Sequence, residues 1–574
     1  MPPEEAASHA LPMRPTVLGT RHMVSAGHWL AAEAAFQILE AGGNAIDAGV
    51  AAGLALGVVQ SDLVNVAGVA PIILRTAAGE VATIAGLGHW PKALPADLFL
   101  RQHAGKIPQG VLRTVVPAAP DAWITALERW GTRSFAEVAA AAMRFAEEGF
   151  LMYPLMAELV GQMAERYARW PSSAAIYLPG GRPPAVGELF RQQDLAASLR
   201  CMVEAERAAA AGGRVAGLHA ARDAFYRGDL AQAILRCQRS EGGYLSASDL
   251  AEFRSGIEPP VAVRFRDWTV YTCGAWCQGP VLAQMLRLLA DLDATIGHNS
   301  LAYVHRVTEA MKLSFADRHA HYGDPRFVSV PLARLLADDY AAERRTLIRA
   351  DRACPGMPSA GLASKPGGRL AHAAGAAAMA LDTSYVAVVD RWGNAFSATP
   401  SDTSFDTPVV PGTGLAISSR GSQSWADPAL PAGVAPGKRP RLTPSPALAV
   451  RDDGALLPFG TPGGDVQAQA MLQCFLNLTL FGIEPQAAVE APRFASYSFP
   501  DSFEPHAMLP GRLALEAPLA RSCGAALGKL GHDVEAWPER TRKAGAVCLV
   551  LAEPGKRRLQ GAADPRRTCY ALGW

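Results

Sequence analysis

The stretch LDTSYVAVVDRWGNAFSATPSD, residues 381–402, contains two short β-prone runs joined by a turn. Residues 384–390 and 395–399 are rich in small and β-forming side chains, and Gly393 with Asn394 lies between them. Gly and Asn accept the positive φ angles of tight turns, so this pattern predicts a β-hairpin. A polar step, Asp382-Thr383-Ser384, opens the hairpin.

The segment before the hairpin, residues 350–382, is rich in Ala, Gly, Pro and Ser. It has no strong periodicity and few large apolar side chains, which predicts a mobile linker or an exposed loop. Long structureless segments inside a compact protein are uncommon, and they tend to be functional or disordered.

The rest of the chain mixes helical and strand patterns. Residues 25–60 predict two helices split at Gly42-Gly43, with Asn44 as the cap of the second helix. Further runs with strand character are residues 70–76, 80–87, 260–273 and 453–460, and further runs with helical periodicity are residues 117–255, 300–322 and 465–482.

Composition and net charge limit the classes of molecule that the chain is expected to bind. The chain has 574 residues, 49% of them hydrophobic, with a net charge of +1 and no run of five basic residues. This balance disfavours nucleic acid and anionic membrane surfaces, and favours a small-molecule substrate. The longest apolar run, residues 48–59, is too short to span a bilayer.

The N-terminus and the cysteines predict a cytoplasmic protein. The first residues lack the basic and apolar regions of a secretory signal. The nine cysteines are scattered, and the close pair Cys273 and Cys277 has no neighbour at zinc spacing. We therefore expect reduced thiols and no metal site.

Thr383 gains a chemical meaning if the chain is cut before it. A Thr hydroxyl is a poor nucleophile and needs a base within hydrogen-bond reach. The α-amino group of an N-terminal Thr, with a pKa of about 7.7 to 8, supplies such a base near neutral pH. Cleavage between Asp382 and Thr383 would free that amine, whereas a Thr at the start of a strand is otherwise only a β-former.

The chain resembles the γ-glutamyltransferases, which are Thr-type N-terminal nucleophile hydrolases. The similarity covers nearly the whole chain in the right order, through the hairpin segment itself and the following motifs: AAEAAFQILEAGGNAIDAGVAAGLALGVV, FYRGDLAQAI, GGYLSASDLAEF, FADRHAHYGDPRFVSVP, PGKRPRLTPSPAL, GTPGGDVQAQ and EAPRF. The resemblance implies an α+β fold, specifically an αββα four-layer sandwich formed jointly by two subunits. It also implies self-cleavage between Asp382 and Thr383 into a large subunit, residues 1–382, and a small subunit, residues 383–574, associated as a heterodimer or heterotetramer.

The family's catalytic residues map onto four positions. Thr383 matches the nucleophile, and Ser401 matches the second hydroxyl, which hydrogen-bonds the nucleophile's amine. Gly463 and Gly464 match the pair whose amides form the oxyanion hole, although a plain tight turn would read the same way. The resemblance implies no organic cofactor and no metal.

The substrate-binding positions depart from the family. The Arg that holds the γ-glutamyl carboxylate falls at Leu87, with His89 as the nearest polar side chain, and the Ser pair falls at Leu442-Thr443. The family Asn falls at Thr403, and Arg420 lies in the neighbourhood of the family Gln. Because an unpaired buried carboxylate costs several kcal/mol, these changes predict a pocket altered from that for γ-glutamyl groups. Arg420 is a candidate for holding an anionic group, or else a structural Arg.

Three functions follow. The leading hypothesis is a self-processing amidohydrolase that cleaves a small-molecule amide through an acyl-enzyme, similar to cephalosporin acylases and other amidohydrolases of the family. The second is an ordinary γ-glutamyl hydrolase or transpeptidase acting on glutathione. The third is an inactive, unprocessed binding protein on the same fold.

Overall fold

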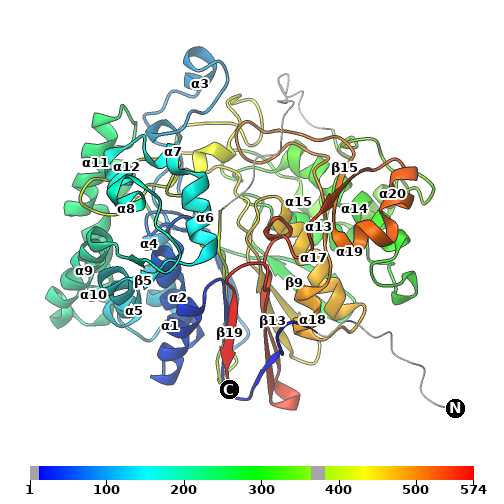
Figure 1. Cartoon of the computed structure of the whole chain (residues 1–574), viewed down its shortest axis with the longest axis horizontal. Helices are drawn as coiled ribbons and strands as arrows, with labels where there is room; N and C mark the ends of the chain where they lie inside the picture. Colours follow the sequence, from blue (N-terminus) through cyan, green and yellow to red (C-terminus); the bar gives the residue numbers. More distant parts are fainter. Residues whose placement is uncertain (1–11, 364–381) are drawn as a thin grey trace.

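The computed structural model describes residues 12–363 and 382–574. The fold is mixed α/β, of the α+β type, with strands in the centre of the molecule and helices on both sides (Figure 1). Residues 1–11 and most of the predicted linker, residues 364–381, lie outside the described residues.

Two seven-stranded antiparallel sheets form the centre. The first contains, in order, β1 (Val17–Gly19), β18 (Arg558–Ala563), β17 (Cys548–Glu553), β13 (Leu456–Gly460), β12 (Ala447–Arg451), β9 (Trp268–Thr272) and β8 (Val261–Phe265). The second contains β19 (Tyr570–Gly573), β2 (Met23–Ala26), β10 (Val386–Val389), β11 (Ala395–Ala398), β3 (Ile72–Arg75), β4 (Val81–Ile84) and β7 (Ile257–Glu258). A smaller sheet of β14 (Phe494–Ser496), β15 (Arg512–Glu516) and β16 (Asp533–Trp537) lies outside these two.

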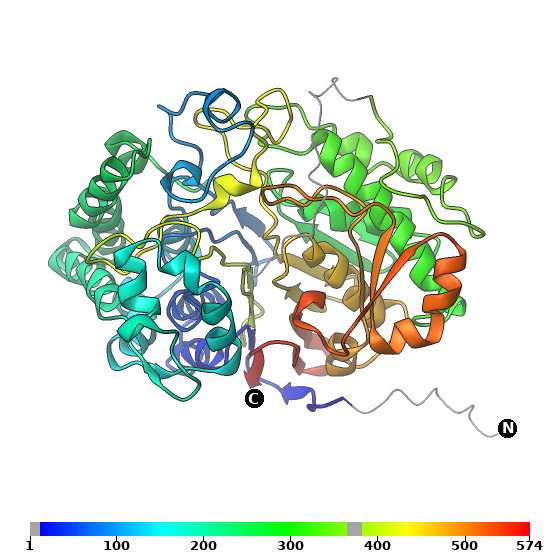
Figure 2. The same ribbon diagram turned by 45° about the horizontal axis from the view of Figure 1, so that its top comes forward.

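Helices flank the strands in two groups (Figure 1). One group comprises α1 (Trp29–Glu40), α2 (Ala45–Val59), α4 (Ala119–Trp130), α5 (Phe135–Glu148), α6 (Pro154–Gln162), α9 (Gln193–Ala208), α10 (Arg214–Tyr226) and α11 (Asp229–Ser240). The other comprises α13 (Gly279–Leu288), α14 (Leu301–His321), α16 (Asp338–Arg345), α17 (Val466–Thr479) and α18 (Pro485–Glu490). The loops that follow β11, drawn in yellow, pass between the two groups at the top of Figure 2.

The strand β10 is buried on both faces because its side chains alternate between two cores. Val386 and Val388 pack with the helices α1, α2, α4 and α5. Ala387 and Val389 instead join a cluster that includes Leu448 from β12 and side chains of β17. Successive strand residues point to opposite faces, so an all-apolar strand is what a position between two cores requires.

The predicted hairpin and helix break are confirmed. β10 pairs with β11 in the register Val386 with Ala398 and Val389 with Ala395. Gly393 in the turn has φ 89°, which glycine adopts without strain. Asn44 caps α2, and its side chain accepts hydrogen bonds from the backbone N–H groups of Ile46 and Asp47.

Residues 350–363 belong to the segment that was predicted to be a mobile linker or an exposed loop. Residues 350–363 form no helix or strand, but hydrogen bonds tie them to neighbouring helices. Cys354 N–H donates to Glu309 of α14 at 3.0 Å, and Gly361 N–H donates to Asp317 at 2.8 Å. Buried carboxylates thus hold this loop against the helices.

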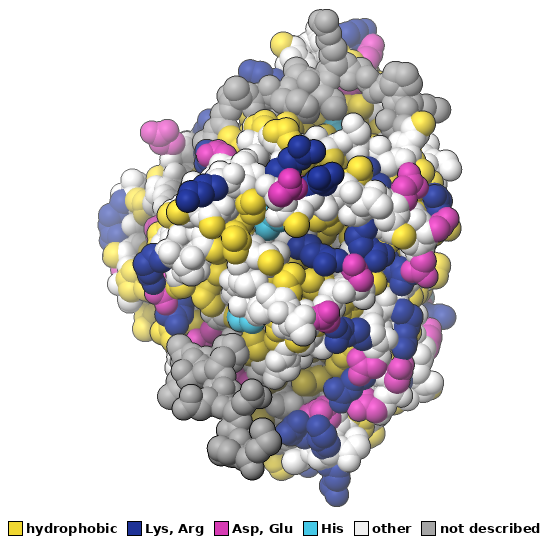
Figure 3. All heavy atoms as spheres, turned by 90° about the vertical axis from the view of Figure 1, so that its right-hand side faces the viewer, with side chains coloured by type: hydrophobic (Ala, Val, Ile, Leu, Met, Phe, Trp, Pro, Cys, Tyr) yellow, Lys and Arg dark blue, Asp and Glu magenta, His cyan; other side chains and the backbone are white. Residues whose placement is uncertain are grey.

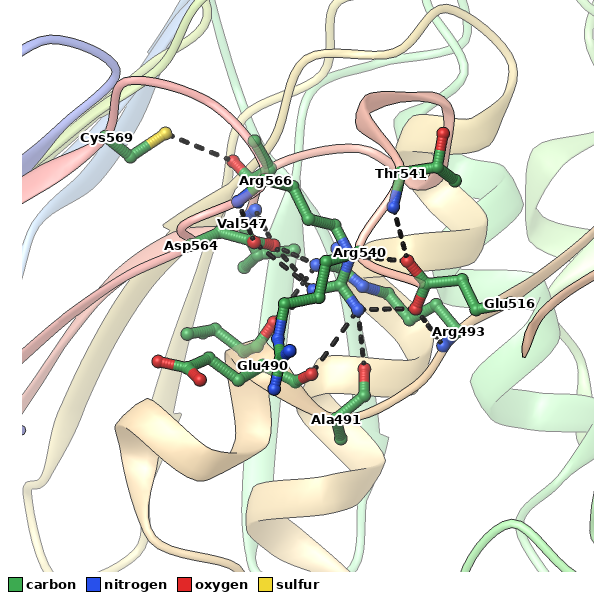
Figure 4. Close-up of polar contacts among 12 residues, drawn as sticks. Glu490, Ala491, Arg493, Glu516, Arg540, Thr541, Val547, Asp564, Arg566 and Cys569 are labelled. Atoms are coloured by element: carbon green, nitrogen blue, oxygen red, sulfur yellow. Dashed lines mark hydrogen bonds and ion pairs between the residues drawn. The ribbon is translucent and has the colours of Figure 1, made fainter. Parts of the chain in front are cut away.

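A buried ion network holds the C-terminal part of the chain together (Figure 4). The Arg566 guanidinium lies between two carboxylates, with Nε 2.8 Å from Glu516 Oε1 and Nη1 3.2 Å from Asp564 Oδ1. Arg493 also donates to Asp564, and Val547 N–H donates to the same carboxylate at 3.1 Å. Because a buried charge is costly without a partner, this network constrains the packing of β15, β17 and the loop after β18.

The surface over the side of α14 and α20 (Ala525–Lys529) carries basic and acidic side chains interspersed with apolar ones (Figure 3). Within residues 12–363 and 382–574, no helix combines the length and the apolar character that crossing a bilayer requires.

Candidate active site

Thr383 lies at the entrance to β10 with its hydroxyl against that of Ser401. The two Oγ atoms are 2.6 Å apart, and both side chains are buried. Thr383 N–H donates to the carbonyl oxygen of Leu63 at 3.0 Å. Its φ of 78° is rare for a β-branched residue and stores strain next to the Asp382–Thr383 peptide bond.

Arg420 connects Ser401 to Asp382. This side chain begins the short 3-10 helix Arg420–Gln423 and is only 1% exposed. Its Nη1 donates to Asp382 Oδ2 and its Nη2 donates to Ser401 Oγ, both at 2.5 Å. Burial opposes the charge, but the carboxylates of Asp382 and Asp402 raise the pKa of Arg420 above its ordinary value.

Asp402 lies next to Arg420 and binds the two serines that precede it. Its carboxylate accepts hydrogen bonds from Ser418 Oγ at 2.5 Å, Ser419 Oγ at 2.7 Å and Ser419 N–H at 3.0 Å. Arg420 Nε lies 3.6 Å from Asp402 Oδ2. Complete burial raises the pKa of Asp402, and the charge of Arg420 with the hydrogen bonds only partly offsets that effect.

A cavity of about 340 Å³ opens beside Asp382 and Arg420. It is lined by Gln109, Arg113, Met163, Arg166, Asp382, Thr403, Phe405, Asp406, Ser419, Arg420, Ser422, Phe503 and Glu504. The buried hydroxyl of Thr403 makes no hydrogen bond to another described residue, so it is available to a ligand in this cavity. The volume suits a small molecule.

Gly463 and Gly464 form the turn between β13 and α17. Their φ angles are 128° and 56°, and neither amide N–H donates a hydrogen bond to another described residue. Gln278 Nε2 donates to the carbonyl oxygens of both Gly464, at 2.8 Å, and Thr443, at 2.9 Å. Two unbonded amides at such a turn are suited to stabilise a developing oxyanion.

Thr443 joins this turn to the Arg420 helix. Its hydroxyl accepts a hydrogen bond from Gln423 Nε2 at 2.8 Å, and its N–H donates to Gln423 Oε1 at 3.1 Å. The candidates Thr443 and Gly464 therefore share Gln278 as a common donor, and Gln423 fixes their position relative to Arg420.

Leu87 and His89 are engaged by residues other than Thr383. Leu87 packs in an apolar cluster with Leu442 and Trp276. His89 Nδ1 pairs with the carbonyl oxygen of Trp90 at 2.8 Å, and burial lowers the pKa of His89. The structure thus brings Thr383, Ser401, Asp382, Arg420 and Thr403 together. The cluster around Leu87 borders this group through Val69, whose backbone pairs with that of Ser401.

Sequence reasoning missed Leu63, Asp402 and Gln423. Asp402 follows Ser401 directly, and Gln423 lies three positions after Arg420, so each lies within three residues of a predicted site residue. Leu63 acts through its backbone carbonyl, for which its side chain gives no signal.

A possible ligand set for a metal lies elsewhere. His305, Glu309 and His532 place one donor atom each within 4.8 Å of one another. However, Lys312 Nζ donates to Glu309 at 2.8 Å, and His305 Nδ1 pairs with His532 Nε2 at 2.9 Å. The buried ammonium already neutralises the carboxylate, so this cluster fits a structural role in joining α14 to residue 532.

Comparisons with known proteins identify the family of the chain. The family model described as Gamma-glutamyltranspeptidase matches residues 31–574. The chain is 33% identical over 559 residues to the Acylase ACY 1 proenzyme of Pseudomonas sp. (strain V22), covering 95% of this chain and 92% of that protein. It is 31% identical over 568 residues to the Glutathione hydrolase-like YwrD proenzyme of Bacillus subtilis (strain 168), covering 98% and 100%.

A solved structure is similar as well. The crystal structure of cephalosporin acylase from Bacillus halodurans superposes with a TM-score of 0.85 at 28% identity, covering 100% of this chain and 99% of that one. The chain is therefore an enzyme that belongs to the gamma-glutamyltranspeptidase family.

Proposed function

We propose that this protein is a self-processing amidohydrolase that uses Thr383 as its nucleophile. The observation that carries the proposal is the buried pair of Thr383 Oγ1 and Ser401 Oγ at 2.6 Å, directly after Asp382. The similar proteins include an acylase and a glutathione hydrolase-like protein, and both are named as proenzymes. These names support the proposal.

The chemistry proceeds in two stages. In the precursor, Thr383 Oγ adds to the carbonyl carbon of Asp382, the C–N bond breaks, and the nitrogen takes the hydroxyl proton. Water then hydrolyses the ester and leaves Thr383 with a free amine. In turnover, this amine accepts the hydroxyl proton as Oγ attacks the substrate amide, and returns it to the leaving amine. Water then hydrolyses the acyl-enzyme ester, which releases the acid and restores the Thr383 hydroxyl.

The other site residues have distinct roles. Ser401 orients the Thr383 hydroxyl, and the amides of Gly463 and Gly464 stabilise the oxyanion. The large subunit, residues 1–382, and the small subunit, residues 383–574, remain associated as a heterodimer in one αββα sandwich, because both sheets contain strands from each. The positive φ of Thr383 adds strain that cleavage relieves.

The pocket differs from that of a γ-glutamyl enzyme. Leu87 lies in an apolar cluster where the family places an Arg, so a carboxylate there would have no charge partner. Thr403 and Arg420 line the cavity instead and supply one free hydroxyl and one guanidinium. We therefore expect the enzyme to hydrolyse glutathione less efficiently than other amides.

Denaturing electrophoresis with N-terminal sequencing tests the proposal. The 60.5 kDa chain should give two bands of about 40 and 20 kDa, and the smaller should begin at Thr383. Thr383→Ala should give one band and no amidase activity, whereas Thr383→Ser should still split. An uncut wild-type protein that turns over amides, or a Thr383→Ala variant that splits at the same bond, would refute the proposal.

A further inference from the structure

Asp382 is both the residue whose carbonyl is attacked and the ligand of Arg420. Its carboxylate carbon is joined to the reacting carbonyl carbon through Cα and Cβ only. The acyl group that the precursor first transfers to Thr383 is therefore an aspartyl group, a four-carbon diacid unit. Asp382 Oδ2 accepts the hydrogen bond from Arg420 Nη1 at 2.5 Å while both side chains are buried.

The aspartyl ester formed in self-cleavage has the same connectivity as an acyl-enzyme. Thr383 Oγ bonds to the carbonyl carbon, the bond from that carbon to the Thr383 nitrogen breaks, and the proton passes from Oγ to nitrogen. Water then adds to the ester carbon, which releases the Asp382 carboxylate and restores the hydroxyl. The site thus completes one hydrolysis of an acyl group whose carboxylate is held by Arg420.

When Asp382 is released, Arg420 loses one of its two carboxylate partners and keeps Asp402. Asp402 stays 3.6 Å from Nε, Ser401 Oγ stays on Nη2, and the guanidinium faces the ring of Phe503 at 5.6 Å. Nη1 then faces the cavity of about 340 Å³, which is also lined by Glu504 and by Asp406, and Asp406 is already paired with Arg113 and Arg166. A buried guanidinium that loses an anionic partner favours binding of another anion.

The geometry limits how far that anion lies from the nucleophile. Arg420 Nη2 is 2.5 Å from Ser401 Oγ, which is 2.6 Å from Thr383 Oγ1. Two hydrogen bonds therefore separate the guanidinium from the reacting hydroxyl. An acyl group that reaches both must be short, as the aspartyl group is.

We infer that the mature enzyme hydrolyses amides of four-carbon dicarboxylic acids, succinyl or aspartyl amides, with Arg420 binding the distal carboxylate in the place of Asp382. This inference rests on the proposed function, because it requires the Asp382–Thr383 bond to be cut. It also means that Asp382 blocks the substrate carboxylate site in the precursor.

Binding of succinate to uncleaved variants tests the blocking role. Thr383→Ala keeps Asp382 on Arg420 and should not bind succinate in calorimetry, whereas the double variant Asp382→Ala with Thr383→Ala should bind it. Adding Arg420→Gln to the double variant should abolish binding. Equal succinate binding by the three proteins, or no binding by any of them, would overturn the inference without depending on cleavage.

Turnover by the cleaved wild-type enzyme tests the substrate class. The succinyl and butyryl p-nitroanilides have acyl chains of the same length and differ in the terminal carboxylate. We expect kcat/KM to favour the succinyl compound by about 100-fold or more, and Arg420→Gln to remove that preference. A cleaved enzyme that prefers the butyryl compound contradicts the inference alone, whereas an uncleaved protein contradicts the proposed function.

Discussion

The backbone N–H of Thr383 donates to the carbonyl oxygen of Leu63 at 3.0 Å, although the two residues lie in different parts of the chain. The same carbonyl accepts the N–H of Asp402 at 3.1 Å. Leu63 follows α2 and thus positions both the nitrogen of the proposed cleavage bond and the loop after β11. In the proposed cleaved protein, the new amine of Thr383 would lie beside the carbonyl oxygen of Leu63. A hydrogen bond to this oxygen restricts the direction from which the amine can accept a proton.

Ser401→Ala should slow self-cleavage and amide turnover by about 10- to 100-fold, because it removes hydrogen bonds to Thr383 and to the Arg420 guanidinium. Ser401→Thr should retain both. The rate at which the precursor band disappears measures the effect. Ser397→Ala is the matched control, since it deletes a 2.6 Å hydroxyl pair with Tyr385 on the same β-hairpin. Equal slowing in the control would assign Ser401 a packing role only.

Gly463→Ala should lower kcat while the protein stays folded. A Cβ at this position has room, with the nearest atoms 3.6 Å away, but residues with a side chain rarely adopt a φ of 128°. The strain should cost about 1–3 kcal/mol in the free energy of unfolding and displace the adjacent amides. Gly528→Ala in α20 has open space and should be neutral or stabilising in thermal unfolding. Full activity in Gly463→Ala would exclude an oxyanion role for this turn.

Asp402→Asn should destabilise the protein by about 1–3 kcal/mol, because an amide cannot accept all of the hydrogen bonds that Ser418 and Ser419 donate to the carboxylate. Urea unfolding of an uncleaved Thr383→Ala background measures this without interference from processing. Asp453→Asn breaks an exposed pair with Arg451 and should cost about 0–1 kcal/mol. Similar losses for the two changes would show that the hydrogen bonds accepted by Asp402 add little to stability.

Asp62 should make stability depend on pH. Burial raises the pKa of this carboxyl to about 7, against the opposing charge of Arg567. The folded protein therefore binds a proton between pH 3.8 and about 7 that the unfolded chain has lost, so stability falls as pH rises through this range. At about 1.4 kcal/mol per pKa unit, the penalty above pH 7 is on the order of 4 kcal/mol.

Asp62→Asn removes that penalty. Its midpoint of thermal unfolding should exceed that of the wild type by several degrees at pH 8, and the difference should shrink towards pH 5. Asp194→Asn, an exposed residue in the first turn of α9, should show no such trend. A constant difference across pH would mean that Asp62 ionises normally in the folded protein.

Local patterns predicted the elements that carry the site. The alternation of residues 384–399 predicted β10 and β11, and Gly42-Gly43 with Asn44 predicted the break before α2. These predictions hold because periodicity and turn chemistry report backbone preferences over a few residues. Composition predicted a mobile linker or an exposed loop at residues 350–363, but it did not predict the hydrogen bonds that hold this loop, because the buried partners Glu309 and Asp317 lie in a helix that composition does not report.

The sequence by itself determined the hairpin, the polar step at Asp382 and Thr383, the Gly463-Gly464 turn and an apolar Leu at position 87. Only the tertiary structure decided that Asp382 meets Arg420, 38 residues away, that Ser401 Oγ reaches Thr383, and that Leu87 lies in an apolar cluster. The physical reason is that loops separated in sequence meet through the packing of two sheets. Side-chain volume and charge across the whole core set that packing, and local propensity does not encode it.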